Sequence, residues 1–95
     1  MKMDDKARAH AVISGRVQGV FFRLETQRAA EGFNVFGWVR NKRDGTVEAV
    51  FEGSEKSVMS ILEWCKKGPP IAKVTNVDVT WEDYEGGFGS FEVTY

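Results

Sequence analysis

The chain has 95 residues, 42% of them hydrophobic and 28% charged, a balance typical of a globular protein with one modest core. Thirteen basic and fourteen acidic side chains leave a formal net charge of −1, so no overall field would draw the chain to nucleic acid or to a membrane surface. We therefore expect a single domain over residues 1–95, with no nucleic-acid partner and no membrane partner.

The composition also bears on the cellular compartment. The single cysteine, Cys65, excludes an internal disulfide and is typical of a reducing compartment. The N-terminal stretch 1–10 is charged and lacks the apolar core of a signal peptide. No apolar run approaches the roughly 20 residues that cross a bilayer. These features favour a cytoplasmic protein.

The first half of the chain alternates between strand-like runs, a helix and turns. Residues 7–14 end in an apolar trio and predict a strand. A loop with two glycines, residues 15–23, leads into a predicted helix over 24–33. Across residues 22–33, an inward helical stripe is expected at Phe22, Thr26, Ala29 and Phe33. Residues 35–40 predict a second strand, and the Asp-Gly pair at 44–45 predicts a hairpin turn after it.

A third strand and a second helix follow the hairpin. Residues 46–51 alternate and predict a strand whose inward face carries Val47, Ala49 and Phe51. We expect residues 52–54 to break this strand and Ser54 to cap the next helix. Residues 66–70 should end that helix with positive charge, a glycine and two prolines. Its apolar stripe is predicted to be Val58, Ile61, Leu62 and Cys65.

The last part of the chain completes a β-α-β-β-α-β order. Residues 77–82 alternate as a fourth strand, residues 83–90 form an acidic, glycine-rich loop, and residues 91–95 form a short closing strand. This order predicts an α+β fold, the ferredoxin-like sandwich, with a mostly antiparallel sheet and both helices on one face. Because many unrelated activities use this architecture, the function has to be inferred from particular residues.

The sequence GRVQGVFFR at residues 15–23 carries the most chemical information. Its two glycines leave backbone N–H groups uncovered by side chains, and the following helix start adds amides with partial positive charge. Arg23 adds a planar fork of donors suited to phosphate oxygens. We therefore predict a cradle for a phosphate or a carboxylate, although by spacing alone a plain tight turn is equally consistent. Neither GxxxxGK[ST] nor GxGxxG is present, which argues against nucleotide binding.

Asn41 is the second candidate. An asparagine suits a strand end or turn and needs no further role there. Its carboxamide is nevertheless both donor and acceptor, so it could hold a water molecule in line for attack. We expect the first two strands to be parallel neighbours, which would bring the loop at 15–23 close to this hairpin.

The remaining reactive side chains give weaker signals. His10 is expected to be a surface or edge residue, and Cys65 a packed, inert thiol. No cluster has the spacing of metal ligands, so we expect no metal. Residues 86–93 faintly resemble the aromatic strand of RNA-recognition domains, but Glu85 replaces the leading basic residue and the segment lies in the last strand. RNA binding is therefore disfavoured.

Taken together, these motifs closely resemble the acylphosphatase family. GRVQGVFFR (15–23) is similar to the family's phosphate-binding loop and arginine. GWVRN (37–41), followed by DGTVEAVFEG (44–53), is similar to its second motif. LEWCKKGPP (62–70) and FEVTY (91–95) also resemble the family, so the similarity covers nearly the whole chain.

The resemblance implies an acylphosphatase, which hydrolyses acyl phosphates to a carboxylate and inorganic phosphate without metal or cofactor. Arg23 would bind the phosphoryl oxygens, and Asn41 would position the attacking water. Phe21 stands at a variable place of the family's loop, where it could tune rate or stability. The resemblance assigns phosphate-binding backbone amides to Gly15, Arg16, Val17, Gln18, Gly19 and Val20.

The resemblance also implies the partners of the chain. The substrate would be a small-molecule acyl phosphate, inorganic phosphate or sulfate would compete as anions, and the protein would be a monomer. A catalytically silent domain that senses an anion or binds a partner is the alternative. Hydrolysis of benzoyl phosphate in the presence of a chelator would separate the two.

Overall fold

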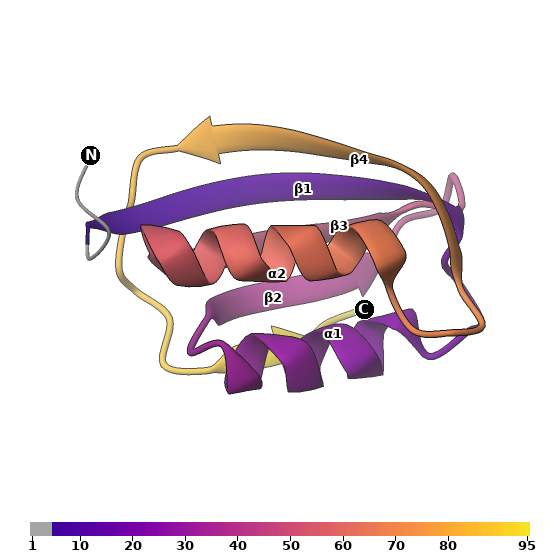
Figure 1. Cartoon of the computed structure of the whole chain (residues 1–95), viewed down its shortest axis with the longest axis horizontal. Coiled ribbons are helices and arrows are strands. Elements are labelled where there is room, and N and C mark those ends of the chain that lie inside the picture. The colour runs from indigo at the N-terminus through magenta and orange to yellow at the C-terminus, as the bar shows by residue number, and fades with distance from the viewer. Residues whose placement is uncertain (1–4) are drawn as a thin grey trace.

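Seven elements follow one another along the chain, and a computed structural model describes them over residues 5–95 (Figure 1). Residues 1–4, part of the charged N-terminal stretch, lie outside the described residues. The strands are β1 (Lys6–Arg16), β2 (Phe36–Asn41), β3 (Val47–Ser54), β4 (Lys73–Glu82) and β5 (Phe91–Val93). The helices are α1 (Phe22–Gly32) and α2 (Glu55–Lys67).

The described strands form one sheet in the order β4-β1-β3-β2-β5, and both helices cover the same face of it (Figure 1). Strand β5 pairs with β2 in parallel, and the other neighbours are antiparallel. The predicted ferredoxin-like sandwich is therefore confirmed. The expected contact between the first two strands is wrong, because β3 lies between β1 and β2 and pairs with both. These two strands still run in the same direction, so both end at the same edge of the molecule.

The core lies between the sheet and the two helices. Every second residue of β1 and β3 faces the helices, and these residues are fully buried: Ala9, Ala11, Ile13, Val47, Ala49 and Phe51. The predicted stripe of α2 is also confirmed, with Val58, Ile61, Leu62 and Cys65 all buried. Across residues 5–95, neither helix has the length and apolar character that crossing a bilayer would require.

Two local predictions differ from the structure. Strand β3 does not break at residues 52–54, because it continues in register with β1 until Ser54 pairs with Lys6. Ser54 still caps α2 as expected, since its hydroxyl accepts a hydrogen bond from the Ser57 N–H at 3.2 Å. In α1, Phe22 and Thr26 are buried as predicted, but Phe33 is 37% exposed because the helix ends at Gly32 and Phe33 leaves the stripe.

Strand β1 reaches further toward the glycine loop than predicted, to Arg16. Its register with β4 shifts between Ser14 and Gly15, and Gly15 adopts φ 120°. A Cβ atom at Gly15 would lie 2.1 Å from the Lys73 carbonyl oxygen, so only glycine fits this close approach. Beyond the bulge, Gly15 and Arg16 still pair with Val74 and Lys73 of β4, and the loop that precedes α1 begins after Arg16.

Glu52 anchors the long loop that returns the chain to β5. It is only 2% exposed, and its carboxylate accepts hydrogen bonds from Arg8 at 3.0 Å and from the N–H groups of Glu85 at 2.9 Å and Gly86 at 3.1 Å. Burial by itself would raise the pKa of Glu52. The hydrogen bonds from Glu85, Arg8 and Gly86 outweigh burial and lower this pKa below its ordinary value.

We predict that Glu52→Gln lowers the free energy of unfolding by about 2–4 kcal/mol near neutral pH, because it leaves Arg8 without this partner in a buried site. A carboxyl group whose pKa is lowered by folding stabilises the protein above its unfolded-state pKa, and this stabilisation is lost as pH falls through the folded-state pKa. Denaturant titrations from about pH 7 to about pH 3 should therefore show a shallower acid dependence in the variant.

The control for this experiment is Glu63→Gln, which removes an exposed carboxylate paired with Lys66 on the surface of α2. Such surface pairs contribute little, so the control should keep both the stability and the pH dependence of the wild type. Parallel acid curves for Glu52→Gln and the wild type would contradict the assignment.

Candidate active site

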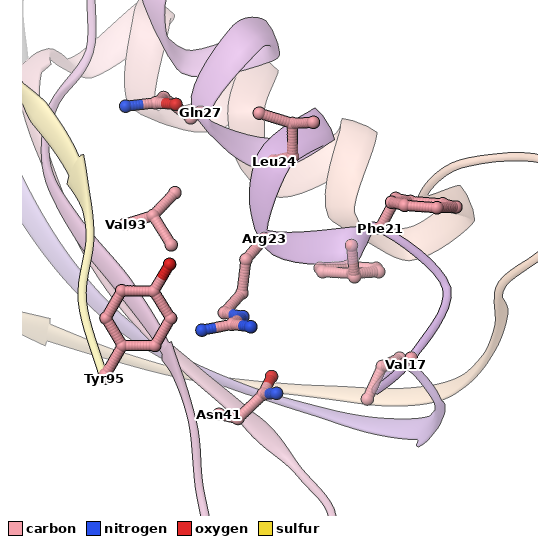
Figure 2. A pocket seen from close by; sticks show the side chains of 10 residues that line it. Val17, Phe21, Arg23, Leu24, Gln27, Asn41, Val93 and Tyr95 are labelled. Atoms are coloured by element: carbon pink, nitrogen blue, oxygen red, sulfur yellow. The ribbon is translucent and has the colours of Figure 1, made fainter.

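Three segments that are distant in sequence meet at one end of the sandwich. These segments are the loop after β1, the hairpin between β2 and β3 and the chain's last residues (Figure 1). Next to them is a pocket of about 540 Å³, whose lining side chains are drawn in Figure 2. The pocket is lined by Val17, Gly19, Phe21, Phe22, Arg23, Leu24, Gln27, Asn41, Val93 and Tyr95. Both residues singled out for chemistry, Arg23 and Asn41, are therefore in the same cavity.

The loop between β1 and α1 leaves its backbone donors free. Across residues 5–95, no protein acceptor takes a hydrogen bond from the N–H groups of residues 17–21. Gly19 adopts φ 73° and Phe21 φ 62°, and α1 begins at Phe22 without a side-chain cap. Unpaired backbone donors at a loop and helix start carry partial positive charge and attract an anion. The local geometry is that of an anion cradle.

Arg23 brings the full positive charge of the pocket. Figure 2 shows its guanidinium near the centre, between Asn41 and Tyr95. It donates one hydrogen bond to the Thr94 carbonyl oxygen at 3.3 Å, and its Cζ lies 4.8 Å from the centre of the Tyr95 ring. Within the described part of the chain, no carboxylate forms an ion pair with it. Arg23 is thus oriented by two neutral partners, and most of its donors remain available to an anion.

Asn41, the last residue of β2, faces Arg23 across the pocket, and its carboxamide points inward (Figure 2). Its Oδ1 is buried and accepts no hydrogen bond from any described residue. A buried carbonyl oxygen without a donor is unfavourable unless a water or a ligand supplies the donor. This orphaned acceptor therefore predicts a bound donor beside the guanidinium.

Gln18 joins the loop to the hairpin. Its carboxamide Nε2 donates to the carbonyl oxygens of Lys42 at 2.7 Å and Thr46 at 2.9 Å, which flank the turn after Asn41. The same turn is closed by the Lys42 N–H, which donates to the Thr46 carbonyl at 2.8 Å. One side chain thus fixes the distance between the free amides and Asn41, although β1 and β2 are not adjacent.

The structure divides the predicted cradle residues into two groups. Val17, Gly19 and Arg23 line the pocket with Asn41, whereas the others do not. Gly15 and Arg16 belong to β1 and pair with Val74 and Lys73 of β4. The Gln18 side chain is turned to the hairpin, and the Val20 side chain is buried in the core.

Sequence reasoning missed the contribution of the C-terminal segment. Thr94 and Tyr95 lie more than 70 positions from Arg23 in sequence, yet they supply its hydrogen-bond acceptor and its aromatic neighbour. The Thr94 N–H is itself held by the Val39 carbonyl at 2.8 Å. No local sequence pattern predicts the contacts of Thr94 and Tyr95 with Arg23, because the parallel pairing of β5 with β2 brings this segment to the pocket.

The other reactive side chains lie away from the pocket. His10 faces the helix-free side of the sheet, where its Nε2 is 2.6 Å from the Glu48 carboxylate. Cys65 is buried in the core, and this burial raises the pKa of its thiol to about 12, as expected for an inert cysteine. Among residues 5–95, no group of three or more His, Cys, Asp or Glu side chains is placed to hold a metal ion.

Comparison with known proteins agrees with the geometry. The family model described as Acylphosphatase matches residues 9–93. A protein named acylphosphatase from Pelotomaculum thermopropionicum is 52% identical over 95% of this chain and 98% of its own length. Another from Syntrophobacter fumaroxidans is 55% identical over 96% of this chain and 94% of its own length. The crystal structure of acylphosphatase from Bacillus subtilis superposes with a TM-score of 0.90 at 38% identity, covering 94% of this chain and 99% of that one.

We predict that Gln18→Ala lowers the free energy of unfolding by about 1–2 kcal/mol, since it removes two hydrogen bonds between the loop and the hairpin. Its NMR spectrum should show the largest amide shifts in residues 41–46. The matched variant Gln18→Glu keeps the shape but places a carboxylate against two carbonyl oxygens, so it should be at least as destabilised near neutral pH. Wild-type stability in Gln18→Glu would show that the bridge has no structural role.

Proposed function

The chain belongs to the acylphosphatase family and hydrolyses acyl phosphates, and we propose that it does so through Arg23, Asn41 and the free amides of residues 17–20, without a metal ion. The observation that carries this proposal is the meeting of three unsatisfied groups in one pocket: unpaired backbone N–H groups, a guanidinium without a carboxylate and the orphaned Oδ1 of Asn41. The buried Oδ1 is unfavourable unless a water or a ligand donates to it, and the amides and the guanidinium are donors left available to an anion.

The phosphoryl group binds between the loop and Arg23. In the loose transition state of phosphoryl transfer, negative charge is spread over the three equatorial oxygens. The amides of residues 17–20 and the guanidinium donate to these oxygens from two sides, and neither has to reorganise during the reaction. Because the carboxylate is a good leaving group, catalysis depends mainly on positioning and on charge stabilisation, so no general acid is required.

Asn41 positions the nucleophile. Its Oδ1 accepts a hydrogen bond from a water molecule and directs that molecule's lone pair toward phosphorus, opposite the acyl oxygen. The water oxygen forms the new P–O bond while the bond from phosphorus to the acyl oxygen breaks. The electron pair of the broken bond leaves with the carboxylate. The water proton passes to a phosphoryl oxygen of the substrate. The products are a carboxylate and inorganic phosphate, and no phosphoenzyme forms.

The same geometry supports the rest of the proposal. Inorganic phosphate and sulfate present the same oxygens as the substrate, so they compete for the cradle. The proposal includes a single domain over residues 1–95 that acts as a monomer. The lone, buried thiol of Cys65 fits a reducing compartment such as the cytoplasm.

The first test replaces the charge. We predict that Arg23→Ala lowers kcat/KM for benzoyl phosphate, assayed with a chelator, by about 10²-fold or more, because it removes a contact that strengthens in the transition state. Inhibition by inorganic phosphate should weaken as well. The matched control is Arg28→Ala on the same helix, where the side chain is exposed and paired with Glu25. A folded Arg23→Ala variant with undiminished activity would refute the proposal.

The second test removes the water-binding carboxamide. Asn41→Ala should lower kcat by about 10²-fold, because the water loses its orientation, while the inhibition constant of inorganic phosphate changes by less than about threefold. Asn41→Asp keeps an acceptor oxygen but adds a negative charge beside the anion, so phosphate inhibition should weaken in this variant. If Asn41→Ala loses phosphate affinity to the same extent as activity, Asn41 binds the phosphoryl group instead of the water.

A further inference from the structure

A second hollow adjoins the phosphoryl pocket. It has a volume of about 270 Å³ and lies where the loop before α1 meets the connection between α2 and β4. Its lining consists of Val20, Phe21, Leu24, Glu25, Pro69, Pro70 and Ile71. Phe21 and Leu24 line both cavities, so the hollow lies next to the phosphoryl pocket, and Figure 2 shows these two side chains at the edge of that pocket. We call the surface formed by Phe21, Leu24 and Ile71 the apolar shelf.

Phe21 is held there at a cost to folding. Its φ of 62° is in the left-handed region, which costs a residue with a Cβ atom about 1–2 kcal/mol. Its ring is 70% exposed, so it contributes little to the core. Strained backbone conformations of this kind concentrate at binding sites, where the strain maintains a needed geometry. An exposed aromatic ring held in this way beside a phosphoryl pocket points to a ligand that covers it.

The rest of the shelf has the same character. Leu24 is 43% exposed and Ile71 is 55% exposed, so the rest of the described chain leaves much of both side chains uncovered. Among the described residues, the one charged side chain that lines the hollow is Glu25, whose carboxylate is paired with Arg28 at 3.1 Å. The hollow therefore offers contact to apolar groups and no cation to a second anionic group.

We propose that the apolar shelf binds the acyl part of the substrate, so that this enzyme prefers acyl phosphates whose acyl group is apolar and at least as large as an aromatic ring. The inference rests on the proposed function, because Arg23 and the loop amides must fix the phosphoryl group in the adjoining pocket. The pocket volume of about 540 Å³ is in the range of sites that hold a whole small molecule, so it has room beyond the phosphoryl group. An acyl group that leaves the phosphorus toward α1 meets Leu24 and Phe21 first, and a longer chain continues to Ile71.

The test compares kcat/KM for acetyl, benzoyl and octanoyl phosphate in the wild type and in three Ser variants. In the wild type, both larger substrates should exceed acetyl phosphate. Leu24→Ser should lower the benzoyl-to-acetyl ratio and the octanoyl-to-acetyl ratio by about 5- to 10-fold. This is at the low end of the effects seen in enclosed apolar pockets, because the contact is open to solvent. Ile71→Ser should lower only the octanoyl-to-acetyl ratio. Met59→Ser, a 52% exposed residue on the outer surface of α2, should change neither ratio.

A fourth variant separates the substrate contact from folding. Phe21→Asn replaces the ring by a residue that tolerates left-handed backbone. It should keep or raise the free energy of unfolding while the benzoyl-to-acetyl ratio falls. A purely structural role for Phe21 would instead lower stability and leave the ratio unchanged.

Two results would overturn the inference. Equal ratios in the wild type and Leu24→Ser would show that the acyl group does not touch the shelf. A wild type that hydrolyses acetyl phosphate as efficiently as octanoyl phosphate would show that the shelf selects nothing. Failure of the proposed function has a different signature, because Arg23→Ala would then retain hydrolysis of all three substrates. The inference alone fails when hydrolysis depends on Arg23 but not on acyl size.

Discussion

The two hydrogen bonds that Gln18 donates to the hairpin are the constraint on which the site depends. A phosphoryl cradle made from backbone N–H groups needs those groups unpaired, and an unpaired loop has no ladder or helix to fix its position. Here the loop is held at both ends and in the middle. It begins after Arg16, which pairs with β4, and it ends where α1 begins at Phe22. The Gln18 carboxamide ties its centre to the turn that follows Asn41. The free amides and the proposed water-binding residue therefore keep one mutual geometry.

The same end of the molecule shows how a cation is kept available inside a folded chain. Arg8 and Arg40, on the helix-free face of the sheet, pair with the carboxylates of Glu52 and Glu48. Arg23 is half-buried yet is positioned by a carbonyl oxygen and an aromatic ring, partners that orient a guanidinium without neutralising its charge. Its orientation depends in turn on the C-terminal segment, whose path is fixed by the pairing of β5 with β2 and by Glu52, which anchors the preceding loop. The ion pair of Glu52 with Arg8 thus helps to hold the segment that orients Arg23, although Arg23 itself pairs with no described carboxylate.

Acyl phosphates differ in their acyl groups, whereas the phosphoryl group is common to all of them. In our proposal, the cradle, Arg23 and Asn41 act on the common phosphoryl group, and the apolar shelf binds the variable acyl group. The strain at Phe21 links the two, because the residue that presents its ring to the shelf is also the last residue of the loop before α1. A left-handed backbone at this position turns the chain into the helix and at the same time holds the ring outward. Rate and substrate range would then respond to the same residue, which makes Phe21 a place where relatives could diverge.

The sequence by itself determined the order of elements, the inward face of β3, the buried face of α2 and the identity of the two residues proposed for chemistry. These properties follow from short-range periodicity, from turn residues such as Asp44-Gly45 and from a motif whose residues are contiguous. Only the tertiary structure decided that β3 separates β1 from β2, that Gly15 and Arg16 lie in the sheet and outside the pocket, and that Thr94 and Tyr95 orient Arg23. It also brought Ile71 beside Phe21 and Leu24. Contacts of this kind join segments tens of residues apart, and because they arise from strand pairing and packing they leave no periodic trace in the chain.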